Sequence, residues 1–235
     1  MSTPGANKPA LPIHVGIILD GNRRWAKAHN LPTLEGHRRG YDNVKKIAEA
    51  AFKSGVRVLT VYAFSTENWR REKAEVEYLL KLFRLFVGKE INTLTKKGVR
   101  INFFGRRGDF DKQLQAGMER VEKETKNNKK GVLNICLSYG GRDEIIRALK
   151  KIMKKGTPLE RISEDLISAH LDSASWPDPD LIIRTSGEER LSRFLTWQSV
   201  YSELYFAKKH WPDFNSRDLD KAIKEYSKRK RRYGK

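Results

Sequence analysis

Three groups of charged and polar residues have the composition of a site for a phosphorylated ligand. The first group spans residues 20–25, with the sequence DGNRRW, and directly follows an apolar run. The carboxylate of Asp20 suits a hard cation such as Mg²⁺, and Gly21 allows the backbone to turn tightly beside a ligand. Arg23, Arg24 and the backbone amides around them suit a diphosphate. The structural alternative is a helix-capping aspartate with two solvated arginines.

The second and third groups also follow apolar runs. Residues 65–71, STENWRR, gather polar groups around one tryptophan, although Ser65 or Thr66 could simply cap the next helix. Residues 184–192, RTSGEERLS, place two arginines and two serines around a glycine. Such donors suit a phosphate. A purely structural interpretation does not explain why an arginine, Arg184, directly follows the apolar residues 181–183.

Two further ionisable residues stand out. His37, in the segment GHRRG, is either a phosphate donor or a local hydrogen-bonding group. Glu203 lies among apolar neighbours in the segment YSELYF. A carboxylate in such surroundings is expected to pair with a cation or a metal ion.

The elements that position these groups alternate along the chain. Strands are expected at 13–19, 56–64, 99–104, 132–137 and 181–183, with a sixth near 204–206, and helices at 37–54, 73–97, 112–127, 143–155 and 216–232. This order predicts one α/β domain with a central, mostly parallel six-stranded sheet flanked by helices. We expect residues 1–12 to form a flexible tail and residues 13–235 to form the domain.

The predicted topology brings the three polar groups together. In open parallel sheets, ligands bind beyond the carboxyl ends of the strands, and each group stands at such an end. Apolar residues between Val76 and Phe86 cover more than one stripe of their predicted helix, which indicates apolar surroundings on several sides. Anion-binding groups beside an apolar space favour an amphiphilic phosphorylated substrate.

Composition excludes several classes of protein. The 235 residues include 48 Lys and Arg against 29 Asp and Glu, a net charge of +19. One cysteine, Cys136, excludes an internal disulfide framework and a Cys-rich zinc site. Walker A, GxGxxG, GxSxG and HExxH motifs are absent from the sequence.

No stretch approaches the roughly 20 apolar residues of a membrane span, and we expect a cytoplasmic protein. Residues 228–232, KRKRR, are either a solvated helix end or a peripheral contact with an anionic membrane.

Six segments, in order, resemble the cis-prenyltransferase family, to which undecaprenyl diphosphate synthase belongs. They are DGNRRWA at 20–26, GHRRG at 36–40, LTVYAFSTENW at 59–69, YGGR at 139–142, PDPDLIIRTSGEERLS at 177–192 and WPDF at 211–214. The resemblance implies a homodimer of α/β subunits, each with a hydrophobic tunnel. It also implies Mg²⁺-dependent condensation of isopentenyl diphosphate with an allylic diphosphate. No nucleic-acid partner is expected, because the basic residues are not accompanied by an alternating aromatic pattern or a nucleic-acid-binding motif.

The resemblance also implies roles for individual residues. Asp20 corresponds to the Mg²⁺-linked catalytic aspartate and Asn68 to the proposed proton acceptor, although a neutral amide is a poor base and we expect it to orient the reacting groups. Glu189 and Glu203 correspond to metal-associated positions, partly across the dimer interface. Substrate contacts are expected from the matched segments, namely Gly21, Asn22, Arg23, Arg24, Trp25, His37, Ser65, Thr66, Glu67, Trp69, Arg71, Arg184, Arg190, Leu191 and Ser192.

The sequence departs from the family pattern at four positions. Arg23 stands where many bacterial members have glycine, and Thr33 where some have a substrate-binding arginine. Glu189 replaces a histidine, and Arg193 replaces a common asparagine. None of these changes removes a group that the reaction requires.

Three functions remain for the structure to separate. The first is an enzyme that extends an allylic primer, expected to be farnesyl diphosphate, into a polyprenyl diphosphate such as undecaprenyl diphosphate, a carrier-lipid precursor. The second is a non-catalytic partner subunit of such an enzyme, and the third is a basic nucleic-acid-binding α/β protein. In the first case, bulk along residues 76–87, including Phe83 and Phe86, would limit the length of the product.

Overall fold

The computed structural model describes residues 11–229, apart from the side chains of 89–93, so the expected N-terminal tail lies almost wholly outside the described residues. Six strands form one sheet in the order β3-β4-β2-β1-β5-β6, and every neighbouring pair is parallel. The predicted α/β fold is therefore confirmed. The strands are β1 (His14–Ile18), β2 (Val58–Ser65), β3 (Val99–Phe104), β4 (Gly131–Tyr139), β5 (Leu181–Arg184) and β6 (Glu203–Phe206).

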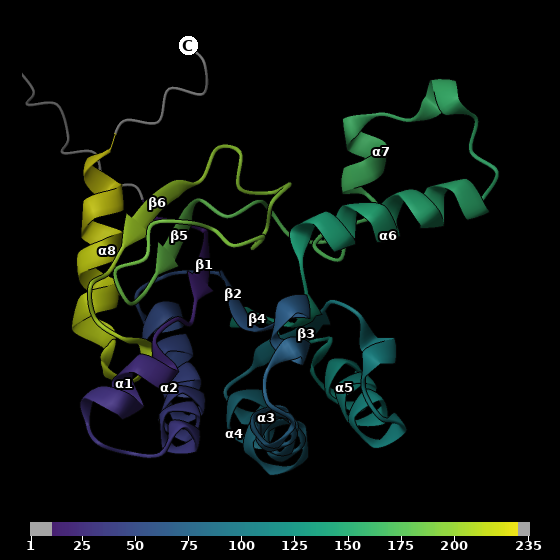
Figure 1. Ribbon diagram of the computed structural model, residues 1–235. Helices are drawn as coiled ribbons and strands as arrows, with labels where there is room; N and C mark the ends of the chain where they lie inside the picture. Colours follow the sequence, from purple (N-terminus) through teal and green to yellow (C-terminus); the bar gives the residue numbers. More distant parts are fainter. Residues whose placement is uncertain (1–10, 230–235) are drawn as a thin grey trace, which may run out of the picture.

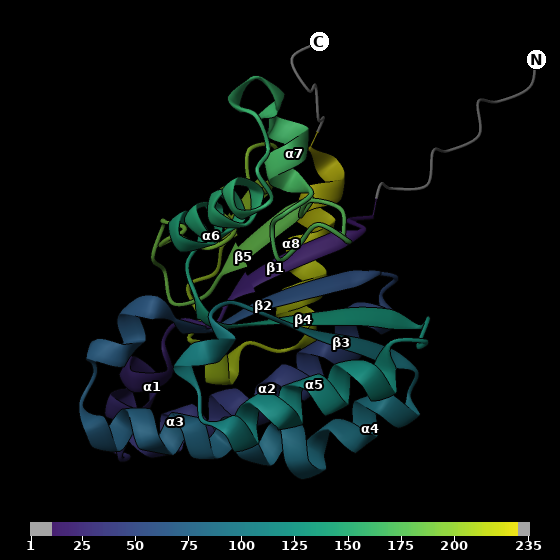
Figure 2. The same cartoon turned by 90° about the vertical axis from the view of Figure 1, so that its right-hand side faces the viewer.

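Helices cover both faces of the sheet (Figures 1 and 2). They are α1 (Asn22–Ala28), α2 (Thr33–Lys53), α3 (Lys73–Leu85), α4 (Ile91–Lys96), α5 (Lys112–Thr125), α6 (Gly141–Lys154), α7 (Glu164–Ser168) and α8 (Ser216–Lys228). Helices α2 to α5 lie on one face, and α6 and α7 lie on the other (Figure 2). Because the strands are covered on both sides, β1, β4 and β5 are almost entirely buried.

Strand β1 lies where the strand order changes direction. It pairs with β2 on one side and with β5 on the other, so the chain leaves β1 toward one edge of the sheet and later returns to the opposite edge. At such a switch point the connections diverge and leave a crevice outside the carboxyl ends of the strands. Residues that follow β1, β2 and β5 therefore converge there.

The predicted helix over 73–97 is divided. Helix α3 ends at Leu85, a π-helical turn spans Phe86–Glu90, and α4 follows. A π turn inserts one residue into the helical repeat, which a pattern of apolar residues does not reveal. Helix α2 begins at Thr33, earlier than the expected residue 37, and Pro32 precedes it with a non-helical backbone.

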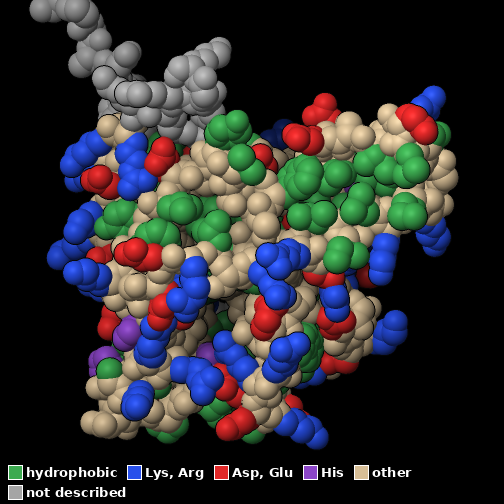
Figure 3. All heavy atoms as spheres, turned by 45° about the horizontal axis from the view of Figure 1, so that its top comes forward, with side chains coloured by type: hydrophobic (Ala, Val, Ile, Leu, Met, Phe, Trp, Pro, Cys, Tyr) green, Lys and Arg blue, Asp and Glu red, His purple; other side chains and the backbone are tan. Residues whose placement is uncertain are grey.

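Helix α6 presents apolar side chains to the surface. Ile146, Met153 and the following Leu159 are 52%, 69% and 76% exposed. We call these three residues the α6 patch. The hydrophobic side chains at the upper right of Figure 3 lie over this part of the molecule.

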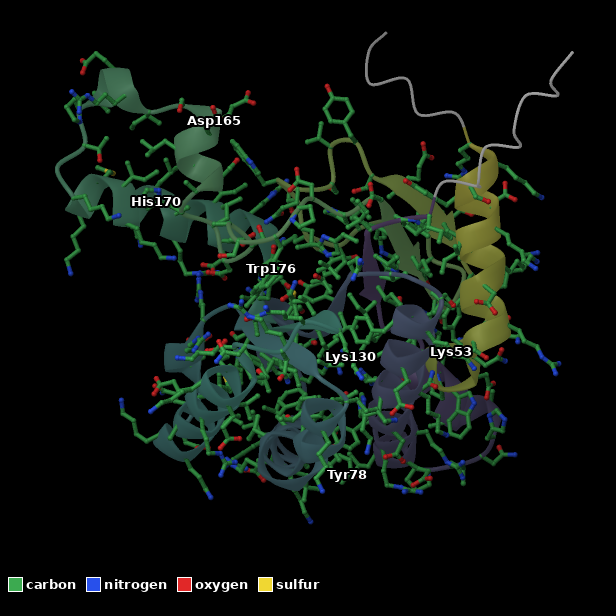
Figure 4. The ribbon with its side chains drawn as sticks, turned by 180° about the vertical axis from the view of Figure 1, so that it is seen from behind. Lys53, Tyr78, Lys130, Asp165, His170 and Trp176 are labelled. Carbon is green, nitrogen blue, oxygen red and sulfur yellow. The ribbon has the colours of Figure 1, made fainter. Side chains whose placement is uncertain are left out.

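The face of the sheet under α6 carries a row of polar side chains, three buried and one half-buried, that crosses four strands. Asn102 Nδ2 donates to Asn134 Oδ1 at 2.8 Å, and Asn134 Nδ2 donates to Thr60 Oγ1 at 3.1 Å. Thr60 Oγ1 lies 2.7 Å from His14 Nε2, and His14 Nδ1 lies 2.6 Å from the carbonyl oxygen of Pro177. We call these four side chains the sheet row. Trp176 lies over the same face (Figure 4), where the Arg100 guanidinium is 4.8 Å from the centre of its ring.

Candidate active site

The three polar groups meet at the carboxyl edge of the sheet. Asp20 follows β1, residues 65–71 follow β2, and Arg184 ends β5, where it is in register with Ile18. A cavity of about 880 Å³ opens at this edge. Its polar lining includes Asp20, Gly21, Asn22, Arg23, Arg24, Lys27, Thr33, His37, Ser65, Asn68, Arg71 and Arg184. Ten of these residues were predicted from the sequence; Lys27 and Thr33 were not.

Oppositely charged side chains form a continuous chain along this edge. Arg184 Nη2 donates to Asp20 Oδ2 at 2.8 Å, and Arg24 Nη2 lies 3.1 Å from Asp20 Oδ1. Arg24 Nη1 also donates to Glu188 Oε1 at 2.6 Å, and the second oxygen of Glu188 accepts from Arg190. We call these five side chains the rim network.

Asp20 is held in its ionised form. Burial alone would raise the pKa of this carboxyl, but the hydrogen bonds and positive charges of Arg184 and Arg24 outweigh burial and lower it. The backbone carbonyl of Asp20 is also fixed, since Thr185 Oγ1 donates to it at 2.7 Å and the backbone N–H of Trp211 at 2.9 Å. A carboxylate thus stands rigidly at the mouth of the cavity.

The loop after β5 wraps around the buried guanidinium of Arg184, a residue that is only 5% exposed. Arg184 Nη1 donates to Ser192 Oγ at 2.8 Å and to the carbonyl oxygen of Arg190. Ser192 and Arg193 have φ angles of +48° and +67°, a backbone conformation that is unfavourable for residues other than glycine. The N–H of Gly141 holds the loop from behind by donating to the Arg193 carbonyl at 2.7 Å. Backbone of this kind, held by its surroundings, is typical of ligand-binding loops.

The glycines of the GHRRG segment allow α1 to pack closely on α2. A β-carbon at Gly36 would lie 2.1 Å from the backbone oxygen of Asn22, and one at Gly40 would lie 2.3 Å from Asn22 Oδ1. Only glycine therefore lets α1, which carries Arg23 and Arg24, lie where it does.

His37, between those glycines, faces a carboxylate that sequence reasoning missed. Its Nε2 lies 2.8 Å from Glu75 Oε1, which also accepts from Arg71 Nη1 at 2.9 Å. Burial lowers the pKa of His37 more than Glu75 raises it, which leaves a neutral imidazole at neutral pH. Glu75 lies on α3, four residues after Arg71, which stands just before that helix. This spacing of opposite charges was the signal available in the sequence.

The segment after β2 is a short 3₁₀ helix, Thr66–Arg70, closed by Asn68. The side-chain oxygen of Asn68 accepts from the backbone N–H of Ser65 at 3.0 Å, which fixes the orientation of the amide at the cavity lining. Trp69 Nε1 donates to Ser138 Oγ at 2.8 Å, and its ring packs against the apolar core. Glu67 pairs with Arg193 of the loop after β5. The segment therefore joins two of the three polar groups.

Comparison with known proteins shows the family to which the chain belongs. A family model described as putative undecaprenyl diphosphate synthase matches residues 18–234. Isoprenyl transferase of Aquifex pyrophilus is 46% identical over 224 residues, covering 95% of this chain and 96% of the relative. Isoprenyl transferase of Thermotoga maritima is 45% identical over 227 residues, covering 95% and 97%. The chain belongs to the undecaprenyl diphosphate synthase family of cis-prenyltransferases.

Solved structures support this assignment. Lavandulyl diphosphate synthase from Lavandula x intermedia, crystallised with dimethylallyl diphosphate, superposes with a TM-score of 0.92 at 33% identity, covering 96% of this chain and 99% of that one. A probable undecaprenyl diphosphate synthase from Campylobacter jejuni superposes with a TM-score of 0.81 at 30% identity, covering 95% and 99%. The chain is thus a prenyltransferase in fold and family.

Beyond its polar mouth, the cavity of this cis-prenyltransferase is lined by apolar side chains. They come from β2, β3 and β4 of the sheet, from α2 and α3, and from the π turn: Tyr41, Val44, Val61, Ala63, Leu79, Leu82, Phe83, Phe86, Val87, Phe103, Ile135 and Leu137. Val61, Ile135 and Phe103 are neighbours in register, four residues before Ser65 on β2. At about 3.3 Å per strand residue, this row lies roughly 13 Å below the mouth.

Several residues predicted as substrate contacts do not line the cavity. Thr66, Glu67, Trp69, Arg190, Leu191 and Ser192 surround its mouth without being part of its lining. Trp25 is 6% exposed and stacks on His29, with ring centres 4.3 Å apart. It packs within the protein rather than facing the cavity, because α1 turns this side chain inward. A direct substrate contact by Trp25 gains no support from this geometry.

The two predicted metal-associated glutamates lie apart from Asp20 within the chain. Glu203 begins β6, next to Leu181, whereas Asp20 follows the opposite ends of the strands. Its carboxylate accepts from Arg229 Nη1 at 2.7 Å. Glu189 is exposed. Among the described residues, no three His, Cys, Asp or Glu side chains converge on a position for a metal ion.

The residues around Asp20 are of the kind that would hold a magnesium ion together with a substrate. Mg²⁺ is commonly held by one or two carboxylates together with substrate phosphates. The Asp20 carboxylate is ionised, and three arginines that suit phosphate oxygens, Arg23, Arg24 and Arg184, line the same mouth. This donor set suits a cation that arrives with a diphosphate rather than one held by protein groups alone.

Proposed function

We propose that the chain condenses isopentenyl diphosphate with an allylic diphosphate, expected to be farnesyl diphosphate, in successive cis additions. The product would be a polyprenyl diphosphate such as undecaprenyl diphosphate, a carrier-lipid precursor. One observation carries the proposal: a mouth of ionised carboxylate and arginines opens directly into an apolar cavity. Such a site suits an amphiphile with a diphosphate head and a hydrocarbon tail.

The proposed reaction begins at the mouth of the cavity. The bond between the allylic carbon and the diphosphate oxygen breaks, and the diphosphate leaves with the electron pair. Arg23, Arg24 and the N–H groups around Gly21, at the mouth of the cavity, are the proposed ligands of this leaving group, and they would stabilise its negative charge. Mg²⁺ held by Asp20 and the diphosphate, as we also propose, would supply further positive charge to the same oxygens.

The second substrate then adds to the allylic carbon. The double bond of isopentenyl diphosphate attacks, a carbon–carbon bond forms, and one proton leaves the former isopentenyl unit. Arg184, Arg190 and Ser192 are the proposed ligands of its diphosphate. We propose that Asn68, in the cavity lining, orients the reacting groups. A diphosphate oxygen, a better base than an amide, accepts the proton.

The apolar cavity would hold the growing chain. Each buried CH₂ group favours binding by about 0.8 kcal/mol, so each addition strengthens the hold on the hydrocarbon while the diphosphate stays at the mouth. Phe83 and Phe86 lie in the lining, as expected of residues that limit product length.

We further propose a homodimer. The α6 patch would give a second copy of the chain an apolar surface to bury. Because Glu203 and Glu189 lie apart from Asp20 of their own chain, they could approach the metal only from a second copy.

None of the described helices is long and apolar enough to cross a membrane. We retain peripheral membrane contact through residues 228–232, most of which lie outside the described part of the chain. Sedimentation of the full chain would test the dimer, and flotation with anionic vesicles would test the membrane contact.

Incorporation of labelled isopentenyl diphosphate tests the proposed function. The chain is incubated with farnesyl diphosphate and Mg²⁺, and the products are separated by length. We expect polyprenyl diphosphates, and none after chelation of Mg²⁺ with EDTA. Absence of incorporation with geranyl, farnesyl and geranylgeranyl diphosphate would instead favour the partner subunit. The intact rim network argues against that alternative, because a subunit without catalysis has no need of an ionised Asp20.

A further inference from the structure

The wall of the cavity continues from α3 into the π turn. Leu79, Leu82 and Phe83 line it from the helix, and Phe86 and Val87 line it from the turn. π turns are rare, and they occur mostly as single turns at functional sites. Because the turn stands at the apolar part of the cavity, its position affects how much hydrocarbon the cavity can hold.

Helix α5 holds this turn from the side away from the cavity. Arg120 Nη2 donates a hydrogen bond to the carbonyl oxygen of Val87 at 2.7 Å. A β-carbon placed on Gly117 would lie 2.7 Å from Val87 Cγ2 and 3.3 Å from its Cβ. Glycine is unfavourable inside a helix, so its presence here is explained by the close approach of Val87.

Neither Gly117 nor Arg120 lines the cavity. Helix α5 is itself anchored in the core by Leu114, Met118 and Val121, each at most 1% exposed. Val87 therefore lies between a fixed helix and the cavity. Any change in its contact with α5 must move the cavity wall, since packed interiors leave little free space to absorb a shift.

We propose that Gly117 and Arg120 are positioning residues that set the length of the prenyl chain by holding Val87 and Phe86 in the cavity wall. The inference rests on the proposed function. Both residues act through the π turn and not through contact with the substrate.

The two positions have opposite expected effects. In Gly117→Ala, the added methyl group displaces Val87 into the cavity, and the products become shorter by one or more isoprene units. In Arg120→Met, the apolar stem remains but the hydrogen bond to Val87 is lost. The turn is then free to move outward, and the products become longer and more varied in length. Arg120→Lys retains a hydrogen-bond donor, so the length of its products is expected to lie between those of Arg120→Met and of the unchanged protein.

The experiment measures product length with labelled isopentenyl diphosphate and farnesyl diphosphate, at matched consumption of substrate. The control is Lys123→Ala, an exposed position on the same helix, which leaves product length unchanged. The double variant Gly117→Ala/Val87→Ala removes the crowding methyl groups and lengthens the products again relative to Gly117→Ala. Loss of rate or thermal stability without a change in length would indicate a merely structural role and overturn the inference.

The outcomes separate this inference from the proposed function. An unchanged protein that makes no prenyl product overturns both. An active protein whose product lengths are the same in Gly117→Ala and Arg120→Met overturns the positioning role alone. If Gly117→Ala fails to fold, Arg120→Met carries the test, because its substitution introduces no clash.

Discussion

The rim network and the sheet row are both chains of hydrogen-bonded polar side chains, but they differ in charge and access. The rim network alternates carboxylates and guanidinium groups, and its side chains of Asp20, Arg24 and Glu188 are 27%, 43% and 29% exposed. The sheet row is uncharged and lies within the sheet, away from the carboxyl edge that carries the rim network. Its members His14, Thr60 and Asn134 are at most 2% exposed.

Burial acts differently on the ionisable group of each chain. In the rim network, arginines overcome the effect of burial and keep Asp20 ionised. In the sheet row, burial lowers the pKa of His14 to about 4, and the imidazole stays neutral. A neutral His14 donates from Nδ1 to Pro177 and accepts at Nε2 from Thr60, so each of its nitrogens has a partner. The hydrogen-bonding groups of His14 are therefore satisfied without a ligand. In the rim network, by contrast, a diphosphate could replace the carboxylates as the partner of the arginines.

The largest expected effect comes from neutralising the rim network at its centre. Asp20→Asn keeps the size of the side chain but removes the negative charge, and we expect turnover to fall by about 100- to 1000-fold, as for the loss of one group that stabilises a transition state. The measurement is the initial rate of isopentenyl diphosphate incorporation. The matched control is Asp165→Asn, an exposed residue on α7 (Figure 4) that is not part of the cavity lining. A near-normal rate in Asp20→Asn, with circular dichroism unchanged, would refute the assignment of this carboxylate.

The sheet row is expected to affect stability instead of rate. Below pH 6.5 the unfolded chain binds a proton at His14, which the folded chain does not bind until about pH 4. Stability is therefore lost as the pH falls through this interval. The loss attributable to His14 is about 3 kcal/mol in the free energy of unfolding.

Urea unfolding at several pH values measures this loss. Comparison with His14→Gln removes the contribution of other titrating groups, because only the difference in pH dependence between the two proteins belongs to His14. The unchanged protein should lose more stability than the variant between pH 7 and pH 4. Parallel curves would mean that the pKa of His14 is the same in the folded and the unfolded chain, which would contradict the prediction.

The rim network was largely predictable from the sequence, and the sheet row was not. The strand ends, arginines and Asp20 are adjacent in the sequence to recognisable apolar runs, and the topology of a parallel sheet then brings them together. The row arises from Asn102, Asn134, Thr60 and His14, four isolated polar residues inside strands. Their pairing depends on strand order and register, which short segments do not encode.

The same limit applies to the residues missed at the mouth and to Glu203. Glu188 stood within the predicted loop, but its bridge between Arg24 and Arg190 depends on two elements that are far apart in sequence. Glu203 was recognised as an acid that needs a partner, yet its position at the amino end of β6 follows from register alone.

A smaller effect is expected from disturbing the helix that carries the rim arginines. Gly36→Ala places a methyl group against the backbone oxygen of Asn22, which has no side-chain freedom with which to yield. We expect a loss of about 1–3 kcal/mol in the free energy of unfolding and a higher KM for the allylic diphosphate, because α1 must move outward. Gly108→Ala is the matched control, since its β-carbon would meet no atom within 4 Å. Equal stability of the two variants would contradict the close packing of α1 on α2.

The smallest expected effect separates two roles of Glu188 in the rim network. This carboxylate either orients Arg24 and Arg190 for the diphosphates or competes with the diphosphates for them. We expect orientation to dominate, because the Arg190 side chain is 60% exposed and Glu188 holds it toward the mouth. Glu188→Gln should then raise the KM for isopentenyl diphosphate a few-fold with little change in kcat, as expected for a partly exposed ion pair. A lower KM, most marked at low salt where the ion pair is strongest, would instead identify Glu188 as a competitor that the substrate displaces.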